Sequence, residues 1–414
     1  MFTNPRSADH LQKRLRPLNM ASFLQGLVFW VPVEKLFMNE IDFDAATVGL
    51  MAAAYAAVVP ILEVPSGILA DRWSRRGVLV AANVALAISA LIGGVSQDVP
   101  TYIASALVLG VCFALSSGTI DSIIYDTVLE ETSNSEAFEL HMGRNRLVDS
   151  AALVVSALVG GALAGIAGTR FTYLLTVPVV LLSIVALWHF SEPQLHRAGD
   201  ATSLRAHVGL TYRTLTRRGR LLPIVTLSML TGVVLQVVLE FGPLWLVALA
   251  VPAVFYGPYW AALVSSLGLG GLIAGRIHLD RPVTAASVAA LMVSASVVLT
   301  FSRDVVVITA AQILLALLVV AAGLHVSRLL NDAVPSTIRA GVASGVSTLT
   351  WIAFLPFALG FGVLSEHHGV HTAGWTITAI TAAAGLLVVG MACTRVATTE
   401  ATAPASLRPV QVLA

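Results

Sequence analysis

Several ionisable side chains lie inside long apolar stretches of this sequence, where water cannot solvate them. Placing one such side chain at the centre of a membrane helix costs about 2.5–3.5 kcal/mol, so each needs a functional or structural reason to be there. Carboxyl and imidazole groups can exchange protons or bind a polar part of a substrate. The candidates for proton coupling or a substrate cavity are Asp121, His325, Glu34, Glu63, Glu240, Tyr125 and Trp30.

Asp121 stands out because it shares one polar stripe with two other side chains. Ser117 and Tyr125 lie four residues before and after it, a spacing that places all three on one face of a helix. Asp121 lies about eight residues from the end of its apolar run, which is about 12 Å deep at 1.5 Å per residue. The functional interpretation is a proton or cation site. The structural alternative is a buried pair with a histidine or tyrosine that serves packing and gating.

Glu34 and Glu240 have similar surroundings near the ends of two other apolar runs. Trp30 and a proline precede Glu34, and Pro243 follows Glu240 among aromatic residues. A broken helix next to a carboxylate often marks a gate or a binding site. The alternative is an acid at the level of the lipid headgroups, paired with Lys35 in the case of Glu34.

A second group of charges predicts a network near the cytoplasmic ends of the helices. Glu63 lies between two prolines and could either bind Arg144 or Arg146 as an inner gate or carry protons. Asp126 and Asp149 are expected to pair structurally with the same arginines. The expected inner charge network is therefore Asp126, Arg144, Arg146 and Asp149.

The composition requires a lipid environment for the elements that carry these groups. Of 414 residues, 57% are hydrophobic and 11% are charged, whereas a soluble domain usually carries about 25% charged residues. A net charge of +1 offers no basic field for nucleic acid. Neither lysine follows a glycine-rich phosphate loop, and the two cysteines lack zinc or disulfide spacing. We therefore expect no nucleotide, metal or cofactor, and no enzyme activity.

Twelve apolar runs are long enough to cross a bilayer as α-helices, which need about 20 residues each. They are too long and continuous for a transmembrane barrel. They predict two six-helix bundles, 18–191 and 221–394, joined by a cytoplasmic linker at 192–220, with cytoplasmic tails at 1–17 and 395–414. The expected spans are 18–38, 46–70, 77–97, 100–129, 143–168, 172–191, 221–248, 253–276, 283–302, 305–331, 338–365 and 372–394.

Lysine and arginine set the orientation of these spans. With the amino terminus in the cytoplasm, only Lys35, Arg170 and Arg303 of the 24 basic residues fall on the outer side. This distribution follows the positive-inside rule and predicts that both termini are cytoplasmic. The expected location is the cell inner membrane, and the basic start of the chain is interpreted as a retained tail and not as a signal peptide.

The two halves of the chain carry related sequences, which indicates an internal repeat. Residues 67–72 read Gly-Ile-Leu-Ala-Asp-Arg, and 204 positions later residues 271–276 read Gly-Leu-Ile-Ala-Gly-Arg. The same offset carries Asp121 onto His325. Parallel six-helix repeats of this kind occur in transporters whose substrate site lies between the repeats, near the middle of the bilayer.

The loop after the second span resembles the G-x-L-A-D-R-x-x-R-R signature of the major facilitator superfamily, with Ser74 where a second glycine is usual. The resemblance extends over the whole chain, through the twelve spans, the central linker and the weaker second copy of the loop. Flanking stretches resemble bacterial drug or metabolite exporters. The residues that match the signature are Gly67, Asp71, Arg72, Arg75 and Arg76.

This resemblance implies that Asp71 contacts a helix end in the second half, so that the loop latches the cytoplasmic side shut. The alternative is a basic loop that serves topology alone. The resemblance also implies that the first, fourth, seventh and tenth spans line the cavity, where Asp121 and His325 would face each other. The usual arginine of the fourth span and proline of the fifth are missing, so proton antiport lacks its common motifs.

The expected function is secondary active export of a small hydrophobic or amphipathic compound by proton antiport, through alternating access of the two bundles. The open alternative is import of a metabolite by proton symport or by uniport. The expected partners are a small-molecule substrate, protons and the lipid bilayer, with the protein acting as a monomer.

Overall fold

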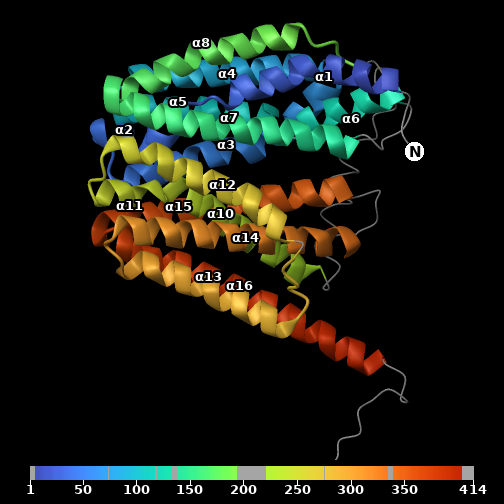
Figure 1. The fold of residues 1–414 in the computed structure, drawn as a ribbon. Helices are drawn as coiled ribbons and strands as arrows, with labels where there is room; N and C mark the ends of the chain where they lie inside the picture. The colour runs from blue at the N-terminus through green and yellow to red at the C-terminus, as the bar shows by residue number, and fades with distance from the viewer. Residues whose placement is uncertain are drawn as a thin grey trace, which may run out of the picture. The chain divides into compact units, whose positions relative to one another are not determined.

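Helices account for almost the whole of the structure. The computed structural model describes residues 5–72, 74–116, 119–132, 138–193, 221–274, 276–333 and 339–402, and these residues form helices with short connections and no strands (Figure 1). Long apolar segments satisfy their backbone hydrogen bonds internally as helices, which a bilayer requires. Most of the expected linker, from residue 194 to residue 220, lies outside the described residues.

The elements of the first half follow the six expected spans, and the first of these spans is divided. The expected first span contains the end of α1, the short 3-10 helix η1 and α2, while the expected fourth span contains α5 and α6. The elements are α1 (Pro5–Gly26), η1 (Val31–Val33), α2 (Glu34–Glu40), α3 (Ala45–Arg72), α4 (Arg75–Val95), α5 (Val99–Ser116), α6 (Thr119–Thr132), α7 (Phe138–Ala167) and α8 (Thr169–Trp188).

The second half follows its six expected spans in the same way. The expected seventh span is divided at Gly242 into α10 and α11. The elements are α10 (Leu222–Phe241), α11 (Pro243–Ala248), η2 (Ala253–Phe255), α12 (Tyr256–Ala274), α13 (Pro282–Phe301), α14 (Val305–Ala333), α15 (Arg339–His368) and α16 (Val370–Thr402).

Ten helical stretches within the described residues are long and apolar enough to cross a membrane. They correspond to every expected span except 18–38 and 253–276. The first of these is interrupted between α1 and η1, and α1 begins in the polar segment that was expected to be a tail. The expected span 253–276 begins with the short 3-10 helix η2 and continues as α12, which has 19 residues.

Contacts between helices group the chain into two compact units that do not coincide with its two halves. Unit 1 comprises Met1–Leu204, Leu239–Ser265 and Trp351–Val370, and unit 2 comprises Arg205–Val238, Ser266–Thr350 and His371–Ala414. Unit 1 therefore combines the first half with the end of α10, α11, η2, the start of α12 and the end of α15. Within it, α4 packs against α5 and α8 (Figure 1).

Glycines allow elements from both halves to meet closely within unit 1. A Cβ added at Gly49 on α3 would lie 2.5 Å from the carbonyl oxygen of Ala358 and 2.9 Å from the Cα of Gly362, both on α15. A Cβ at Gly161 on α7 would lie 2.5 Å from the backbone nitrogen of Gly257 on α12. The backbones of these two helix pairs are therefore in direct contact, as small residues permit in membrane bundles.

Two carboxylates cap the start of α3. The backbone N–H of Thr47 donates to Asp44 Oδ1 at 2.7 Å, and the N–H of Ala45 donates to Glu366 Oε2 at 2.9 Å. The first of these bonds is the main reason why the pKa of Asp44 lies below its usual value. A carboxylate also interacts favourably with the positive end of the helix dipole.

We expect Asp44→Ala to lower the stability of the protein by about 1 kcal/mol, the usual cost of losing an N-cap residue. Because the pKa of Asp44 is lower in the folded than in the unfolded state, its contribution is complete above the unfolded pKa and fades as the pH falls through the folded one. Thermal unfolding of the purified protein at pH 7 and at pH 3 measures this. An equal loss at both values would contradict it.

Candidate functional site

The first expected span is broken next to the charged residues that it carries. Residues 27–30 separate α1 from η1, and the backbone N–H of Phe29 donates to Thr176 Oγ1 at 3.1 Å on α8. Gly160 on α7 faces the backbone of Phe29, where a side chain at position 160 would collide with it. The break redirects the chain so that Glu34 and Lys35 begin α2 inside unit 1. Interrupted helices of this kind often carry the binding sites of transporters.

A buried group of charges and phenols lies at the start of α2, and we call it the Lys35 cluster: Glu34, Lys35, Glu240, Tyr55 and Tyr102. The ammonium of Lys35 donates to Glu34 Oε2 at 2.9 Å and also to Glu240 Oε1. Lys35 is only 3% exposed, so the two carboxylates replace its hydration shell. A buried charge is tolerated when it is paired and hydrogen-bonded in this way.

Tyrosine hydroxyls hold both carboxylates of the cluster in place. Tyr55 donates to Glu240 Oε2 at 2.8 Å, and Tyr102 donates to Glu34 Oε1 at 3.0 Å. The hydroxyl of Tyr102 also lies 2.7 Å from that of Tyr173. The resulting network connects α2 with α3, α5, α8 and the end of α10. Such a network fixes the orientation of every group that it includes.

Aromatic rings surround the cluster and keep its environment apolar. The indole of Trp30 stacks on Tyr173, with ring centroids 5.1 Å apart. The ring of Tyr55 meets Trp351 edge to face at 6.0 Å and lies 6.1 Å from Phe113. Electrostatic interactions are stronger in such surroundings than in water, because the local dielectric constant is lower.

The formal charges within the Lys35 cluster do not balance. Two carboxylates share one ammonium, so these five side chains carry one negative charge in excess when both carboxyls are ionised.

The structure brings together Glu34 and Glu240, which the sequence analysis had placed only near the ends of two different spans. Glu34 and Glu240 were expected at equivalent places in the two halves, and Lys35 now links them directly. Lys35 and the tyrosines were not among the expected site residues. The available signal was that one of only two lysines adjoins a glutamate in an apolar run.

Asp121 and His325 each have a charged neighbour on the same unit. Asp121 Oδ1 accepts from Arg146 at 3.1 Å, and both side chains are about half exposed or more. In unit 2, His325 Nε2 lies 3.9 Å from Asp280, which also accepts from Arg328 at 2.9 Å. Because they belong to different units, the pairing of Asp121 with His325 stays a prediction.

A small pocket, with room for about one water molecule, adjoins His325 within unit 2. Aliphatic side chains form most of its wall, and Asp280 and His325 supply its polar part. The lining residues are Leu227, Leu279, Asp280, His325, Leu329, Val388, Met391 and Ala392.

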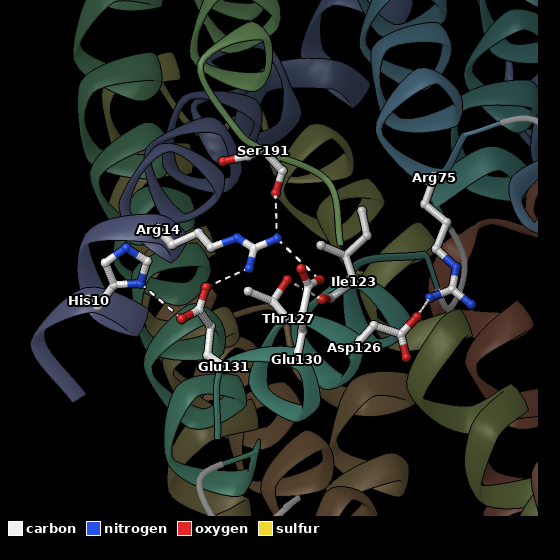
Figure 2. Close-up of polar contacts among 9 residues, drawn as sticks. All are labelled: His10, Arg14, Arg75, Ile123, Asp126, Thr127, Glu130, Glu131 and Ser191. Carbon is white, nitrogen blue, oxygen red and sulfur yellow. Dashed lines mark hydrogen bonds and ion pairs between the residues drawn. The ribbon is translucent and has the colours of Figure 1, made fainter. Parts of the chain in front are cut away.

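A second charged group lies at the end of α6, and Figure 2 shows its members. Arg14 on α1 donates to Glu131 Oε1 at 2.6 Å and to Glu130 Oε2 at 3.3 Å, and His10 lies 2.9 Å from Glu131. Arg14 also reaches the carbonyl oxygen of Ser191 at 3.4 Å. These bonds join the start of α1 to the ends of α6 and α8.

The inner charge network agrees with the expectation for Asp149 and differs from it for Asp126. Asp126 accepts from Arg75 of the signature loop (Figure 2). Arg75 also donates to the carbonyl oxygen of Ser122 at 3.2 Å. Arg146 binds Asp121 and also interacts electrostatically with Asp149, as expected, while Arg144 is exposed. The carboxylate of Asp149 lies against α1 at Gly26.

Ser74 caps the helix that follows the signature loop, which gives a structural reason for a serine where glycine is usual. The N–H of Gly77 donates to Ser74 Oγ at 2.9 Å, and Ser74 Oγ donates to Glu192 Oε2 at 2.6 Å. Glu192 Oε1 accepts from the N–H of Arg75 at 2.6 Å. Ser74 is thus the N-cap of α4, and it ties the loop to the residues that follow α8.

Two further residues of the expected site are described. Tyr125 is exposed and meets Phe138 edge to face at 5.4 Å, while Arg76 donates to the carbonyl oxygen of Phe190 at 3.1 Å.

Other residues of the expected site have side chains that lie outside the description. The proposed latch and the role of Glu63 therefore stay predictions. The side chains outside the description are those at Glu63, Gly67, Asp71 and Arg72.

Comparison with known proteins assigns the chain to one family of transporters. Residues 18–351 match the sequence profile of the Major Facilitator Superfamily. Multidrug resistance protein 2 of Bacillus subtilis (strain 168) is 25% identical over 161 residues, which are 39% of this chain and 38% of that protein. The probable nitrate transporter NarT of Staphylococcus aureus (strain Newman) is 24% identical over 106 residues, which are 26% of this chain and 27% of that protein. The chain thus spans well under half the length of each relative.

Solved structures share the fold over nearly the whole chain. The nucleoside transporter NupG superimposes with a TM-score of 0.72 and 16% sequence identity, covering 92% of this chain and 98% of that one. At this identity the likeness concerns the fold alone. Together with the family match, it confirms the predicted all-α membrane fold of twelve helices in two pseudo-symmetric bundles.

Proposed function

Because the chain belongs to the Major Facilitator Superfamily, we propose that this multi-pass membrane transporter exports a small hydrophobic or amphipathic organic compound in exchange for protons. The proposed cycle is alternating access of the two six-helix bundles, within the cell inner membrane and with both termini cytoplasmic. The protein is proposed to work as a monomer.

The Lys35 cluster is the observation that carries this proposal. It places two carboxylates and one ammonium among apolar and aromatic side chains, with one negative charge in excess. A proton on Glu240 would remove its charge and weaken its hold on Lys35, which would remain bound to Glu34. Glu240 comes from the second half of the chain and Lys35 from the first. Protonation would therefore loosen one contact between the bundles and link proton binding to their movement.

Asp121 and His325 are alternative candidates for the group that carries the coupled proton. Asp121 is about half exposed beside Arg146 and is therefore accessible to water, and His325 lies 3.9 Å from Asp280. Export is favoured by the match to a multidrug resistance protein. Import of a small metabolite is the second candidate, because the match to a probable nitrate transporter is of similar strength.

Flux measurements in proteoliposomes test the proposal. A panel of cationic, neutral and anionic amphipathic compounds would be offered with a pH gradient imposed in either direction. The proposal expects at least one compound to move against its gradient when protons move the opposite way. Movement of substrate together with protons would support the importer, and flux that is indifferent to the pH gradient would contradict proton coupling.

Asp121→Asn provides a test of one alternate. If Asp121 carries the coupled proton, this variant should lose pH-driven flux, because an amide cannot bind a proton at neutral pH. Arg146→Gln removes the partner and leaves the carboxylate, so it serves as the control for a structural effect. Flux with an unchanged dependence on pH in Asp121→Asn would remove Asp121 from the mechanism.

A further inference from the structure

Lys35 occupies a place that a positive charge from outside the chain could take. We propose that Glu240 binds the cationic group of an amphipathic substrate, and that Lys35 is a built-in competitor for this site. The inference rests on the proposed transport function and deepens it by naming the substrate class, an organic monocation with an apolar body.

Replacement of one cation by another makes such binding possible inside an apolar region. A cation that replaces Lys35 at Glu240 leaves the carboxylate compensated, so no buried charge is exposed without a partner. Lys35 does not have to leave the cluster, because Glu34 Oε2 already accepts from its ammonium at 2.9 Å. The cluster can therefore separate into two pairs, Lys35 with Glu34 and the substrate with Glu240. Two carboxylates around one lysine are the minimum that this exchange requires.

Aromatic rings next to Glu240 suit a cation with an apolar body. Tyr55 donates its hydroxyl to Glu240 Oε2 at 2.8 Å, and the centroid of its ring lies 6.1 Å from that of Phe113 and 6.0 Å from that of Trp351. Trp351 in turn meets Phe354 edge to face at 6.2 Å. The faces of such rings attract organic cations, while a neutral or anionic compound would gain nothing from the carboxylate.

Other charged and titratable groups leave Glu240 as the point of exchange. A tyrosine holds each carboxylate, but Glu34 adjoins Lys35 at the start of α2, whereas Glu240 comes from α10 and can separate from Lys35. Arg170 lies over the ring of Phe37 and donates to the carbonyl oxygen of Gly94 at 2.8 Å, away from the carboxylates of the cluster. A proton and a substrate cation would compete for Glu240. This competition couples the two in opposite directions.

The experiment measures binding, not flux, in the full chain reconstituted in lipid nanodiscs. The probes are tetraphenylphosphonium, a monocation, and triphenylphosphine oxide, a neutral compound with three of the same rings. Glu240→Gln should weaken tetraphenylphosphonium binding by about thirtyfold or more, the lower end of the loss when one partner of a buried charge pair is removed. Binding of the oxide should be unchanged. Glu366→Gln, which alters a carboxylate outside the cluster, should bind both probes as the unaltered chain does.

Lys35 variants test the competition itself. Lys35→Met removes the internal cation and should strengthen tetraphenylphosphonium binding by about tenfold. Lys35→Arg should not strengthen it, because a guanidinium can hold both carboxylates. If Lys35→Met does not fold, the comparison of Glu240→Gln with Glu366→Gln still decides the question.

Equal binding of both probes, or equal affinity of Glu240→Gln and the unaltered chain for tetraphenylphosphonium, would overturn the inference. Specific binding in this pattern without any flux would instead contradict the transport proposal and leave the cation site standing. Proton-driven flux of a neutral compound, without tetraphenylphosphonium binding, would contradict only the cation site.

Discussion

Replacing Lys35 by methionine should lower the stability of the protein by about 3–5 kcal/mol, the usual cost of removing one partner from a buried ion pair. Methionine retains the apolar stem but leaves Glu34 and Glu240 without the ammonium that joins them. Thermal unfolding of the purified protein at neutral pH measures this loss.

The other lysine of the sequence supplies a matched control. Lys13 is exposed on α1, so Lys13→Met removes the same charge from the surface. An exposed ion pair contributes at most about 1 kcal/mol, so this change should cost much less than Lys35→Met. If the two variants unfold at the same temperature, the buried pairing of Lys35 is wrong.

Adding one methyl group at Gly49 should impair both stability and transport. The new Cβ would lie 2.5 Å from the carbonyl oxygen of Ala358 and 2.9 Å from the Cα of Gly362, so α3 and α15 would have to move apart. Overpacking of this kind typically costs about 1–3 kcal/mol. Because the contact joins elements of both halves, we expect Gly49→Ala to slow substrate flux by about tenfold if 1.4 kcal/mol of this cost falls on one step of the cycle.

Gly360 offers a control on the same helix. A Cβ at Gly360 would meet nothing within 4 Å, so Gly360→Ala should leave both the melting temperature and the flux unchanged. Gly362→Ala, whose Cβ would lie 2.7 Å from the carbonyl oxygen of Ala45, should behave like Gly49→Ala. If Gly49→Ala and Gly360→Ala were equally active and stable, the close contact would not matter for the cycle.

The fold followed from properties that act locally along the chain. Continuous apolar runs require helices in a bilayer, and their number and lengths can be counted from hydropathy alone. The proline at position 32 and Gly242 with Pro243 marked the interruptions in two of these runs, and the structure breaks both spans close to these residues. The positions of the helices were therefore predictable without knowledge of their contacts.

The candidate site was less predictable, because its contacts join distant parts of the sequence. Glu34 and Glu240 were recognised as unusual, but no local pattern says that Lys35 binds a carboxylate 205 residues away. Lys35 was named from the sequence only as a partner of the neighbouring Glu34, a pair that the structure shows, and as one of the few basic residues outside the cytoplasm. Tyr102 and Tyr173 resemble ordinary interfacial tyrosines until packing places their hydroxyls 2.7 Å apart.

Ion pairs near the signature loop were also hard to predict from the sequence, because they too depend on how the helices pack. Asp126 was expected to bind Arg144 or Arg146, which lie near it in the sequence, and it binds Arg75 instead. Helix packing determines which arginine reaches a carboxylate, and several arginines of this half satisfied the sequence pattern equally well. Ser74 was seen as a departure from the signature, and its capping bond to Gly77 and its contact with Glu192 give that departure a structural reason.

The central claim is that the Lys35 cluster couples protons to substrate movement, and Glu240→Gln tests it most directly. An uncoupled transporter still exchanges substrate across the membrane but cannot use a pH gradient to concentrate it. We therefore predict that Glu240→Gln proteoliposomes retain exchange of labelled for unlabelled substrate and lose accumulation driven by the pH gradient. Accumulation by Glu240→Gln at the level of the unaltered protein would contradict the claim.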